Sequence, residues 1–362
     1  MLIGVDASRA VAARPTGTEL YSQRLIQALL SSESPHRFRL YFRSAPPAGA
    51  FAGSEACVIP FPRLWTHARL SWEMMRHPPD ALFVPAHVLP LVHPPTSLVT
   101  VHDLGYLHFP GSHPRLQRWY LDLTTRWNAR AATHVLADSE ATKVDLVAHY
   151  GTPAEKITVA YPGPDDTLAP VRDGDMLETV QAKYGIAGSY FLYLGTLQPR
   201  KNLARLIDAF AALASDTVLA LAGKPGWLYD DLFDQVHRGG LQERVRFLGY
   251  VPAEDKAALL SGALAFVFPS LYEGFGLPVL EAQACGCPVI TSTTSSLPEV
   301  AGEAALLVDP IDTQAIAAAM ERVTADRALR QTLVECGFAN TRRFSWAACA
   351  QSVLGILNQP VV

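Results

Sequence analysis

Short apolar segments alternate with longer amphipathic segments along almost the whole chain. An uninterrupted apolar segment is typical of a strand buried on both faces of a parallel sheet, and the longer segments are long enough for crossover helices. The strands predicted in the first half are LIGVD, FRLYF, ALFVP, SLVTV, THVLA and ITVAY. Those predicted in the second half are YFLYLG, TVLALAG, VRFLGY, LAFVFPS, PVITS and AALLV. The pattern predicts a doubly wound, Rossmann-like α/β domain that occurs twice.

A segment rich in Pro, Gly and Asp, YPGPDDTLAPVRDGD, separates the two halves. It lacks helical or strand periodicity, as is typical of an interdomain linker. We expect an N-terminal domain over residues 1–168 and a C-terminal domain over residues 169–344. Residues 345–362 are predicted to form a final amphipathic helix, with Ser345 as the N-cap before Trp346.

The apolar fraction, the net charge and the cysteine count of the 362 residues indicate what class of protein this is. An apolar fraction of 49% with 18% charged residues is typical of a soluble globular enzyme. The formal charge of -4 argues against nucleic-acid binding by the whole protein. The five scattered cysteines indicate a reducing compartment, and we interpret Cys285 and Cys287 as small buried residues, not metal ligands. No signal peptide or membrane-spanning segment is evident, so a cytoplasmic location is expected.

The segment FVFPSLYEGFGLPVLEAQA predicts a buried strand, a glycine-rich turn and a helix. Gly274 and Gly276 would let the backbone approach a ligand, and Pro278 suits the first turn of the helix. The N-terminus of that helix offers free N–H groups for an anion. Glu273 and Glu281 flank this point and would accept hydrogen bonds from hydroxyl groups on either side of a phosphate. The combination predicts a sugar-nucleotide site, although each feature alone also fits a purely structural turn.

The nicotinamide and Walker alternatives fit this segment poorly. Val279 stands where the dinucleotide fingerprint needs a third glycine, and no Walker loop is present. A second segment, YFLYLGTLQPRKNLARLIDAF, places Arg200 and Lys201 before a helix for which Asn202 is the predicted N-cap. Two cations at a helix start oppose the helix dipole, so an anionic ligand is favoured over a solvated surface pair.

In open parallel sheets, ligands bind beyond the carboxyl ends of the strands. Polar residues or glycines follow five of the predicted strands: Asp6, His102 with Asp103, Asp138 with Ser139, Gly195 with Thr196, and Ser270 to Glu273. A histidine at a strand end is often structural, but its place beside Asp103 favours a functional role for His102. We expect the two sets of residues to face each other across a ligand-binding cleft.

The motifs GTLQPRKN and FPSLYEGFGLPVLEAQACGCPVITS resemble those of the retaining family-4 glycosyltransferases of the GT-B fold. Within that family the chain is similar to bacterial mannosyltransferases that use GDP-mannose. The E-x7-E signature is present as Glu273 and Glu281. VHDLGYLHFP, VLADSEATKVDLVAHYG and FSWAACA also fit, so the resemblance covers nearly the whole chain.

The resemblance implies a role for each candidate residue in binding the donor. Glu281 would bind the ribose hydroxyls and Glu273 those of the transferred sugar, while Arg200 and Lys201 would neutralise the diphosphate. The remaining donor-binding candidates act through the backbone, or by close approach to sugar, phosphate or base: Gly17, Gly195, Tyr250, Val251, Gly274, Phe275, Gly276 and Leu277. His102 with Asp103 would lie near the reacting carbon of the sugar. The last helix would pack back on the N-terminal domain.

The resemblance also implies front-face attack with retention, the donor phosphate acting as base, and no cofactor or metal. Two alternatives of other classes remain open: a sugar-nucleotide epimerase and a non-catalytic sugar-nucleotide sensor. A UDP-sugar donor is the alternative to GDP-mannose. The acceptor would be a glycan or lipid-linked saccharide, as in polysaccharide assembly.

Two segments, RLWTHARLSWEMMRH and HPRLQRWYLDLTTRWNAR, mix aromatic residues with arginines. Such a mixture suits peripheral docking on the inner face of an anionic membrane. The simpler alternative is a core-facing stripe with arginines that extend to solvent.

Overall fold

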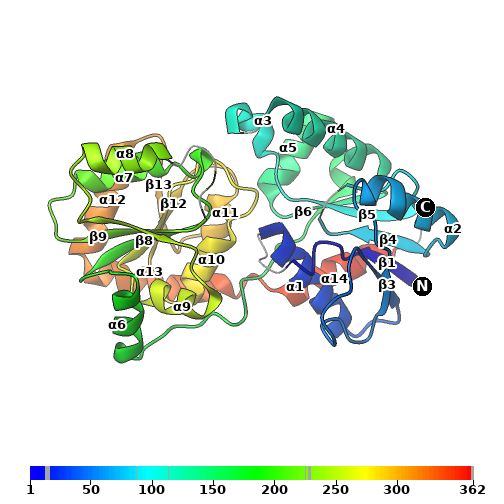
Figure 1. The fold of residues 1–362 in the computed structure, drawn as a ribbon, viewed down its shortest axis with the longest axis horizontal. Coiled ribbons are helices and arrows are strands. Elements are labelled where there is room, and N and C mark those ends of the chain that lie inside the picture. Colours follow the sequence, from blue (N-terminus) through cyan, green and yellow to red (C-terminus); the bar gives the residue numbers. More distant parts are fainter. Residues whose placement is uncertain (13–16, 87, 113, 225, 227–229, 360–362) are drawn as a thin grey trace. The chain divides into compact units, whose positions relative to one another are not determined.

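The computed structural model describes residues 1–12, 17–86, 88–112, 114–224, 226 and 230–359, and shows two compact α/β units (Figure 1). Unit 1 comprises Met1–Gly163 and Phe344–Val362, and unit 2 comprises Pro164–Arg343. The expected boundaries at 168 and 344 lie close to these points. No helix in the described ranges has the length and apolar character needed to cross a bilayer.

Unit 1 contains a seven-stranded parallel sheet in the order β3-β2-β1-β4-β5-β6-β7. Its strands are β1 Leu2–Asp6, β2 Arg37–Phe42, β3 Glu55–Val58, β4 Ala81–Val84, β5 Thr96–Val101, β6 His134–Ala137 and β7 Ile157–Val159. Its α-helices are α1 Gly17–Ser31, α2 Ser71–Arg76, α3 Gly105–His108, α4 Arg115–Ala131, α5 Glu140–Tyr150 and α14 Trp346–Leu357. Short helical turns are η1 Trp65–Leu70, η2 Pro110–Ser112 and η3 Ala154–Lys156.

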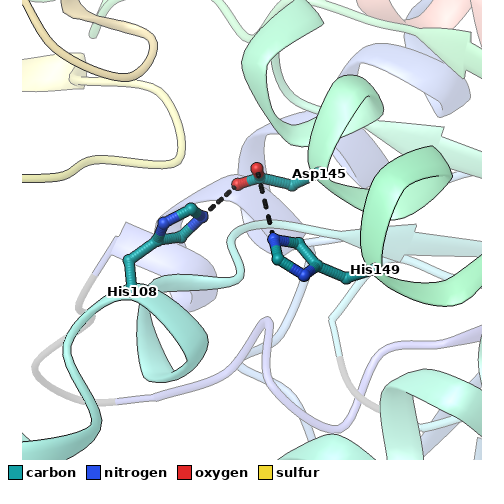
Figure 2. A group of neighbouring side chains, drawn as sticks. All are labelled: His108, Asp145 and His149. Carbon is teal, nitrogen blue, oxygen red and sulfur yellow. Dashed lines mark hydrogen bonds and ion pairs between the residues drawn. The ribbon is translucent and has the colours of Figure 1, made fainter.

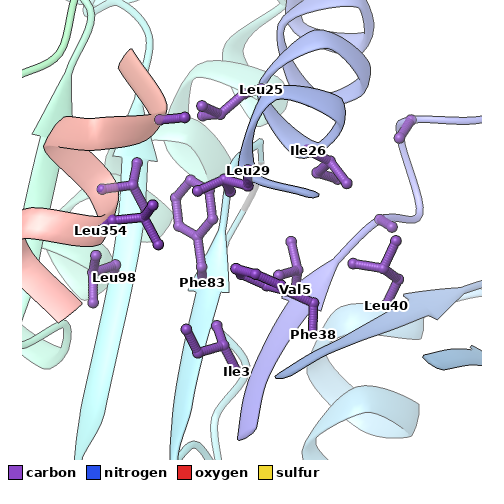
Figure 3. Close-up of a cluster of buried hydrophobic side chains, with 14 of the residues drawn as sticks. Ile3, Val5, Leu25, Ile26, Leu29, Phe38, Leu40, Phe83, Leu98 and Leu354 are labelled. Carbon is purple, nitrogen blue, oxygen red and sulfur yellow. The ribbon is translucent and has the colours of Figure 1, made fainter. Parts of the chain in front are cut away.

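Both faces of this sheet are buried. Successive side chains of each strand point to opposite faces, so the core of unit 1 consists of two clusters, one on each face. Ile3, Val5 and Phe83 belong to the cluster that packs against α1 and α14, which Figure 3 shows. Their neighbours Leu82 and Val84 belong to the cluster on the opposite face. The final helix therefore completes the core of the N-terminal unit, as predicted, and Ser345 caps it by accepting a hydrogen bond from the N–H of Ala348.

Unit 2 repeats the architecture with a six-stranded parallel sheet in the order β10-β9-β8-β11-β12-β13. Its strands are β8 Tyr190–Leu194, β9 Val218–Ala222, β10 Val245–Gly249, β11 Ala265–Phe268, β12 Val289–Ser292 and β13 Leu306–Val308. Its helices are α6 Gly174–Lys183, η4 Pro199–Lys201, α7 Leu203–Ala211, α8 Asp230–Arg238, α9 Ala253–Ser261, α10 Leu277–Ala284, α11 Leu297–Ala301, α12 Thr313–Ala325 and α13 Arg327–Thr341.

Every strand predicted from the apolar pattern is present, and the doubly wound fold is confirmed in both halves. The sequence pattern missed β3, because this edge strand is largely exposed and carries little apolar signal. Cys285 and Cys287 are buried free thiols, as expected.

Candidate active site

The sheet order of unit 2 brings two distant loops together. Strand β8 lies beside β11, with β9 and β10 beyond it on one side and β12 and β13 beyond β11 on the other. Such a reversal of strand order is where open α/β sheets bind ligands. The loop after β8 carries Arg200 and Lys201, and the loop after β11 carries Glu273. A backbone hydrogen bond of 2.9 Å from Leu271 to the carbonyl of Arg200 joins the two loops.

The carboxylate of Glu273 is the centre of this site. One of its oxygens lies 2.5 Å from Lys201 Nζ and also accepts a hydrogen bond from the hydroxyl of Ser270. The other oxygen lies 3.5 Å from Arg200 Nη1. Glu273 and Lys201 are only 7% and 9% exposed, so the alternative of a solvated surface pair of cations is wrong.

The electrostatics of the cluster favour an ionised carboxylate. Burial is the largest single influence and raises the pKa of Glu273. The charges of Lys201 and Arg200, with the hydrogen bonds from Lys201 and Ser270, outweigh it and lower that pKa below its usual value. Two cations share one carboxylate, so the cluster carries one excess positive charge. It can therefore attract an anion while Glu273 remains available to hydroxyl donors.

Two serines hold the glycine-rich loop that follows Glu273. The backbone N–H of Glu273 donates to Ser295 Oγ at 2.9 Å, and Ser296 Oγ donates to the carbonyls of Glu273 and Phe275. Gly276 has φ of 116°, and a Cβ there would lie 2.9 Å from Leu297 Cδ2, so only glycine fits. The loop is thus preorganised. Sequence reasoning missed both serines, whose only signal is the run of small polar residues TSTTSS, which begins within the predicted strand PVITS and continues beyond it.

Helix α10 begins at Leu277, with Pro278 in its first turn, as predicted. Its Glu281 is 4% exposed and forms an ion pair of 2.5 Å with Lys256 Nζ of α9. Lys256 could not be recognised from the sequence as a site residue, because a lysine in a helical segment is ordinary. The two glutamates of the E-x7-E signature are therefore both buried, and each is held by a lysine.

Asn202 precedes α7 as predicted, but its side chain does not cap the helix. It adopts a left-handed conformation with φ of 62°. Its Nδ2 group donates to the carbonyls of Pro269 and Pro310, at 3.0 and 2.6 Å. The expected capping role is wrong, because the side-chain oxygen that would cap the helix instead accepts a hydrogen bond of 2.9 Å from Arg205 Nη1.

The neighbouring strand ends are packed closely. Gly195 N–H donates to the carbonyl of Ala222, and a Cβ on Gly223 would lie 1.8 Å from the oxygen of Gly195. Sequence reasoning missed this need for glycine at position 223. The expected base-binding segment presents the 54% exposed ring of Tyr250, with Lys224 Nζ 5.1 Å from its centroid, followed by the half-buried Val251.

In unit 1, His102 follows β5 and is held on three sides. Its Nδ1 lies 2.6 Å from Asp138 Oδ2, its Nε2 lies 3.0 Å from the carbonyl of Pro85, and the ring of Tyr21 packs edge-on at 4.7 Å. Burial lowers the pKa of His102. The charge of Asp138 and its hydrogen bond together raise that pKa by more than burial lowers it, so the pKa lies above its usual value. Asp103 instead accepts a hydrogen bond from the backbone N–H of Gly105.

Two further candidate positions lie in unit 1. Asp6 is the last residue of β1, and its Oδ2 has no hydrogen-bond partner among the described residues. Burial raises its pKa to about 6, against smaller opposing influences from Ser8 and nearby arginines. Gly17 is the first residue of α1, and a Cβ there would meet nothing within 4 Å. The loop before Gly17 lies outside the described residues, so its expected role at a diphosphate stays a prediction.

Comparison with known proteins gives two family models and a close relative. The model described as Glycosyltransferase Family 4 matches residues 15–168, and the one described as Glycosyl transferases group 1 matches residues 180–339. The O-antigen chain mannosyltransferase B of Escherichia coli is 35% identical over 263 residues, covering 71% of this chain and 69% of that protein. Other Escherichia coli mannosyltransferases that it matches are longer, and the chain spans 30% or less of their length.

Solved structures share the fold at low sequence identity. Sucrose-phosphate synthase from Thermosynechococcus elongatus superposes with a TM-score of 0.80 at 22% identity, over 99% of this chain and 98% of that one. HepE of Anabaena, solved in complex with UDP-glucose, superposes with a TM-score of 0.77 at 20% identity, over 98% of each chain. With the two family models and the Escherichia coli relative, this likeness shows that the chain belongs to the family-4 glycosyltransferases of the GT-B fold.

Proposed function

We propose that this glycosyltransferase moves mannose from GDP-mannose to a glycan or lipid-linked saccharide acceptor, with retention of anomeric configuration. The observation that carries the proposal is the buried carboxylate of Glu273, held by Lys201 and Arg200 beside a helix N-terminus. The 35% identity to an O-antigen chain mannosyltransferase supports mannose as the sugar. Membership of a glycosyltransferase family argues against the epimerase and sensor alternatives.

The charges of the site suit the departure of a diphosphate. Breaking the anomeric bond builds negative charge on the leaving diphosphate, and preorganised cations and N–H dipoles stabilise it. Arg200 and Lys201 supply the cations, and the first turn of α10 supplies N–H groups. Glu273 is kept ionised by the same cations and would accept hydrogen bonds from sugar hydroxyls. On this proposal Glu281 accepts hydrogen bonds from the ribose, and Lys256 holds its carboxylate in place.

A UDP-sugar is the alternative donor. The base is expected to meet backbone groups and the exposed ring of Tyr250, and neither selects strongly between guanine and uracil. HepE, which shares the fold, was solved with UDP-glucose.

Calorimetric titration with GDP, UDP and ADP, without added metal, tests the donor. We expect GDP to bind most tightly, and GDP-mannose turnover to give a product whose anomeric configuration, read by NMR, equals that of the donor. If UDP bound most tightly, the proposed donor would change to a UDP-sugar, but the proposed reaction, transfer of a hexose, would stand. Failure of all three nucleotides to bind would overturn the proposed roles of Glu281, Arg200 and Lys201.

We also propose that helix α4 docks on an anionic membrane surface, where a lipid-linked acceptor would reside. Its first half turns four apolar side chains outward, and they are 42% to 84% exposed: Leu116, Trp119, Tyr120 and Leu123. Its buried positions include Thr124, Thr125 and Asn128. The core-facing alternative is therefore wrong for the first half of this helix, whereas Trp127 in its second half packs against the core, as that alternative expected. In the other segment the outcome is mixed, since Trp65 and Met74 are buried whereas Trp72 and Met75 are exposed.

The spacing and charge of α4 support this docking surface. Positions 116, 119, 120 and 123 share one helical face. Arg115 and Arg118 are exposed on the same two turns. Exposed apolar side chains flanked by arginines are typical of helices that lie in the interfacial region of anionic membranes.

A further inference from the structure

Three side chains of unit 1 form a compact group outside the candidate donor site (Figure 2). His108 ends α3, and Asp145 and His149 lie on α5. We propose that these three residues bind a divalent first-row transition-metal ion, with Zn²⁺ the expected occupant.

The donor atoms already lie close to one another. His108 Nε2 is 2.9 Å from Asp145 Oδ2, and His149 Nε2 is 4.0 Å from Asp145 Oδ1. One ligand atom from each residue can be chosen so that all three lie within 4.8 Å of one another. Ligands at about 2.1 Å from a tetrahedral zinc ion are roughly 3.4 Å apart, so side-chain rotations alone would complete the site. Figure 2 shows both imidazoles turned toward the carboxylate.

The backbone places the three ligands independently of any ion. Asp145 and His149 are four residues apart, so they project from one face of α5. Helix α3 is fixed beside α5 by the hydrogen bond of 2.7 Å between Tyr106 and Tyr150. The third ligand, His108, therefore stands on an anchored turn, which reduces the entropy lost when it binds an ion.

The chemistry of the ligands selects the class of ion. Two neutral imidazoles and one carboxylate suit zinc, copper, nickel or cobalt, whereas magnesium and calcium prefer oxygen ligands. Three protein ligands leave one tetrahedral position for water. The side chains of His108, Asp145 and His149 are 35%, 15% and 44% exposed, so an ion can enter from solvent. Nowhere else in the described residues does such a group of three occur.

A bound ion would act as a cross-link between α3 and α5, and its binding would be linked to protons. Imidazoles must be neutral to bind a metal, so affinity should fall as the pH is lowered. The site shares no residue with the proposed donor-binding machinery. Its occupation should therefore leave nucleotide binding by unit 2 unchanged.

The test is a titration of ZnCl₂ into the full chain, stripped of metal with EDTA and free of any histidine tag. We expect one ion per chain in calorimetry. Co²⁺ should give a visible absorption spectrum typical of nitrogen and oxygen ligands at a site of low coordination number. His108→Ala, Asp145→Asn and His149→Ala should each weaken Zn²⁺ binding by more than about tenfold.

His77→Ala is the matched control. His77 and Glu73 form another histidine–carboxylate pair at spacing i,i+4, at 3.0 Å, in which the imidazole is exposed, but no third ligand joins them in the described residues. This variant should bind Zn²⁺ like the unmodified chain. Absence of binding in the unmodified chain would overturn the proposal, and so would stoichiometric binding that survives in both His108→Ala and His149→Ala. Circular dichroism of each variant would show that lost binding is not lost folding.

Discussion

The imidazole of His102 is bound by Asp138 and not by its sequence neighbour Asp103. Strands β5 and β6 run parallel with Val101 opposite Ala137, so the residues that follow them, His102 and Asp138, lie side by side. Their side chains meet at 2.6 Å. Asp103 forms a local turn with Gly105 instead. Sheet register, which the sequence does not display, therefore decides the partner of the histidine.

Replacing His102 by Ala should abolish sugar transfer, with a fall of at least about 100-fold, if the imidazole stabilises charge at the reacting sugar. Nucleotide affinity should change little, because the charged side chains proposed to bind the nucleotide, Glu281, Arg200 and Lys201, belong to unit 2. Initial rates and GDP titration separate these two effects. A variant that keeps most of its activity would remove His102 from the catalytic residues.

Asp138→Asn should change the pH dependence of stability. Because the pKa of His102 is raised in the folded protein, its pairing with Asp138 contributes stability that is lost as the pH rises from about 6.5 through the raised value. Burial also raises the pKa of Asp138, so the ion pair weakens again at acid pH. The amide cannot form that ion pair, so this loss should disappear. Urea midpoints measured across neutral and alkaline pH would test it. If the urea midpoint changed with pH equally in Asp138→Asn and the unmodified protein, the assigned ion pair between His102 and Asp138 would be contradicted. A shift in the pH profile of sugar transfer in Asp138→Asn would identify Asp138 as a positioning residue.

Lys201→Met should lower the transfer rate by about 10²–10³ and weaken nucleotide binding, since it removes a preorganised cation. It also leaves the buried carboxylate of Glu273 without its nearest charge, which should raise the pKa of Glu273. Lys183→Met is the matched control. Lys183 pairs with Asp255 at 2.6 Å but is 53% exposed, so we expect at most about 1 kcal/mol of lost stability and unchanged binding.

Lys256→Met should destabilise unit 2 by about 3 kcal/mol, because it leaves the buried carboxylate of Glu281 unpaired. Adding Glu281→Gln to this variant should recover part of the loss, since the uncompensated charge is then absent. Urea denaturation of the single and double variants measures the coupling. A double variant less stable than Lys256→Met would show that the pair is not the source of the effect. Glu281→Gln alone should also weaken nucleotide binding.

Trp119→Glu should reduce co-sedimentation with anionic vesicles at low salt, because it places a carboxylate in the exposed apolar face of α4. Ile311→Glu is the control, since Ile311 is similarly exposed, at 65% against 64%, but belongs to unit 2. Nucleotide binding should be unaffected in both variants. Equal vesicle binding by Trp119→Glu and the unmodified protein would contradict docking through α4.

The strands and the loop motifs could be predicted from the sequence because both depend on local pattern. Apolar segments mark buried strands, and glycine, proline and acidic residues at fixed spacing mark the loop of Glu273. The partners across the sheet could not be predicted in this way. Asp138 could be placed at a strand end, but its pairing with His102 depends on strand register. Lys256, Ser295 and Ser296 contact the E-x7-E segment through the packing of unit 2, and their own neighbourhoods in the chain are ordinary.

Helix α14 belongs to the core of unit 1 but is synthesised after unit 2. Its buried residues, among them Trp346, Val353 and Leu354, pack with Ile3, Val5 and Leu25, which are synthesised before unit 2. All of Pro164–Arg343 is made in between and forms a compact unit with its own sheet. While the chain grows, the earlier-made unit has an open apolar face until the last helix arrives. Termination of translation within α14 would therefore destabilise unit 1, although most of unit 1 is translated before unit 2.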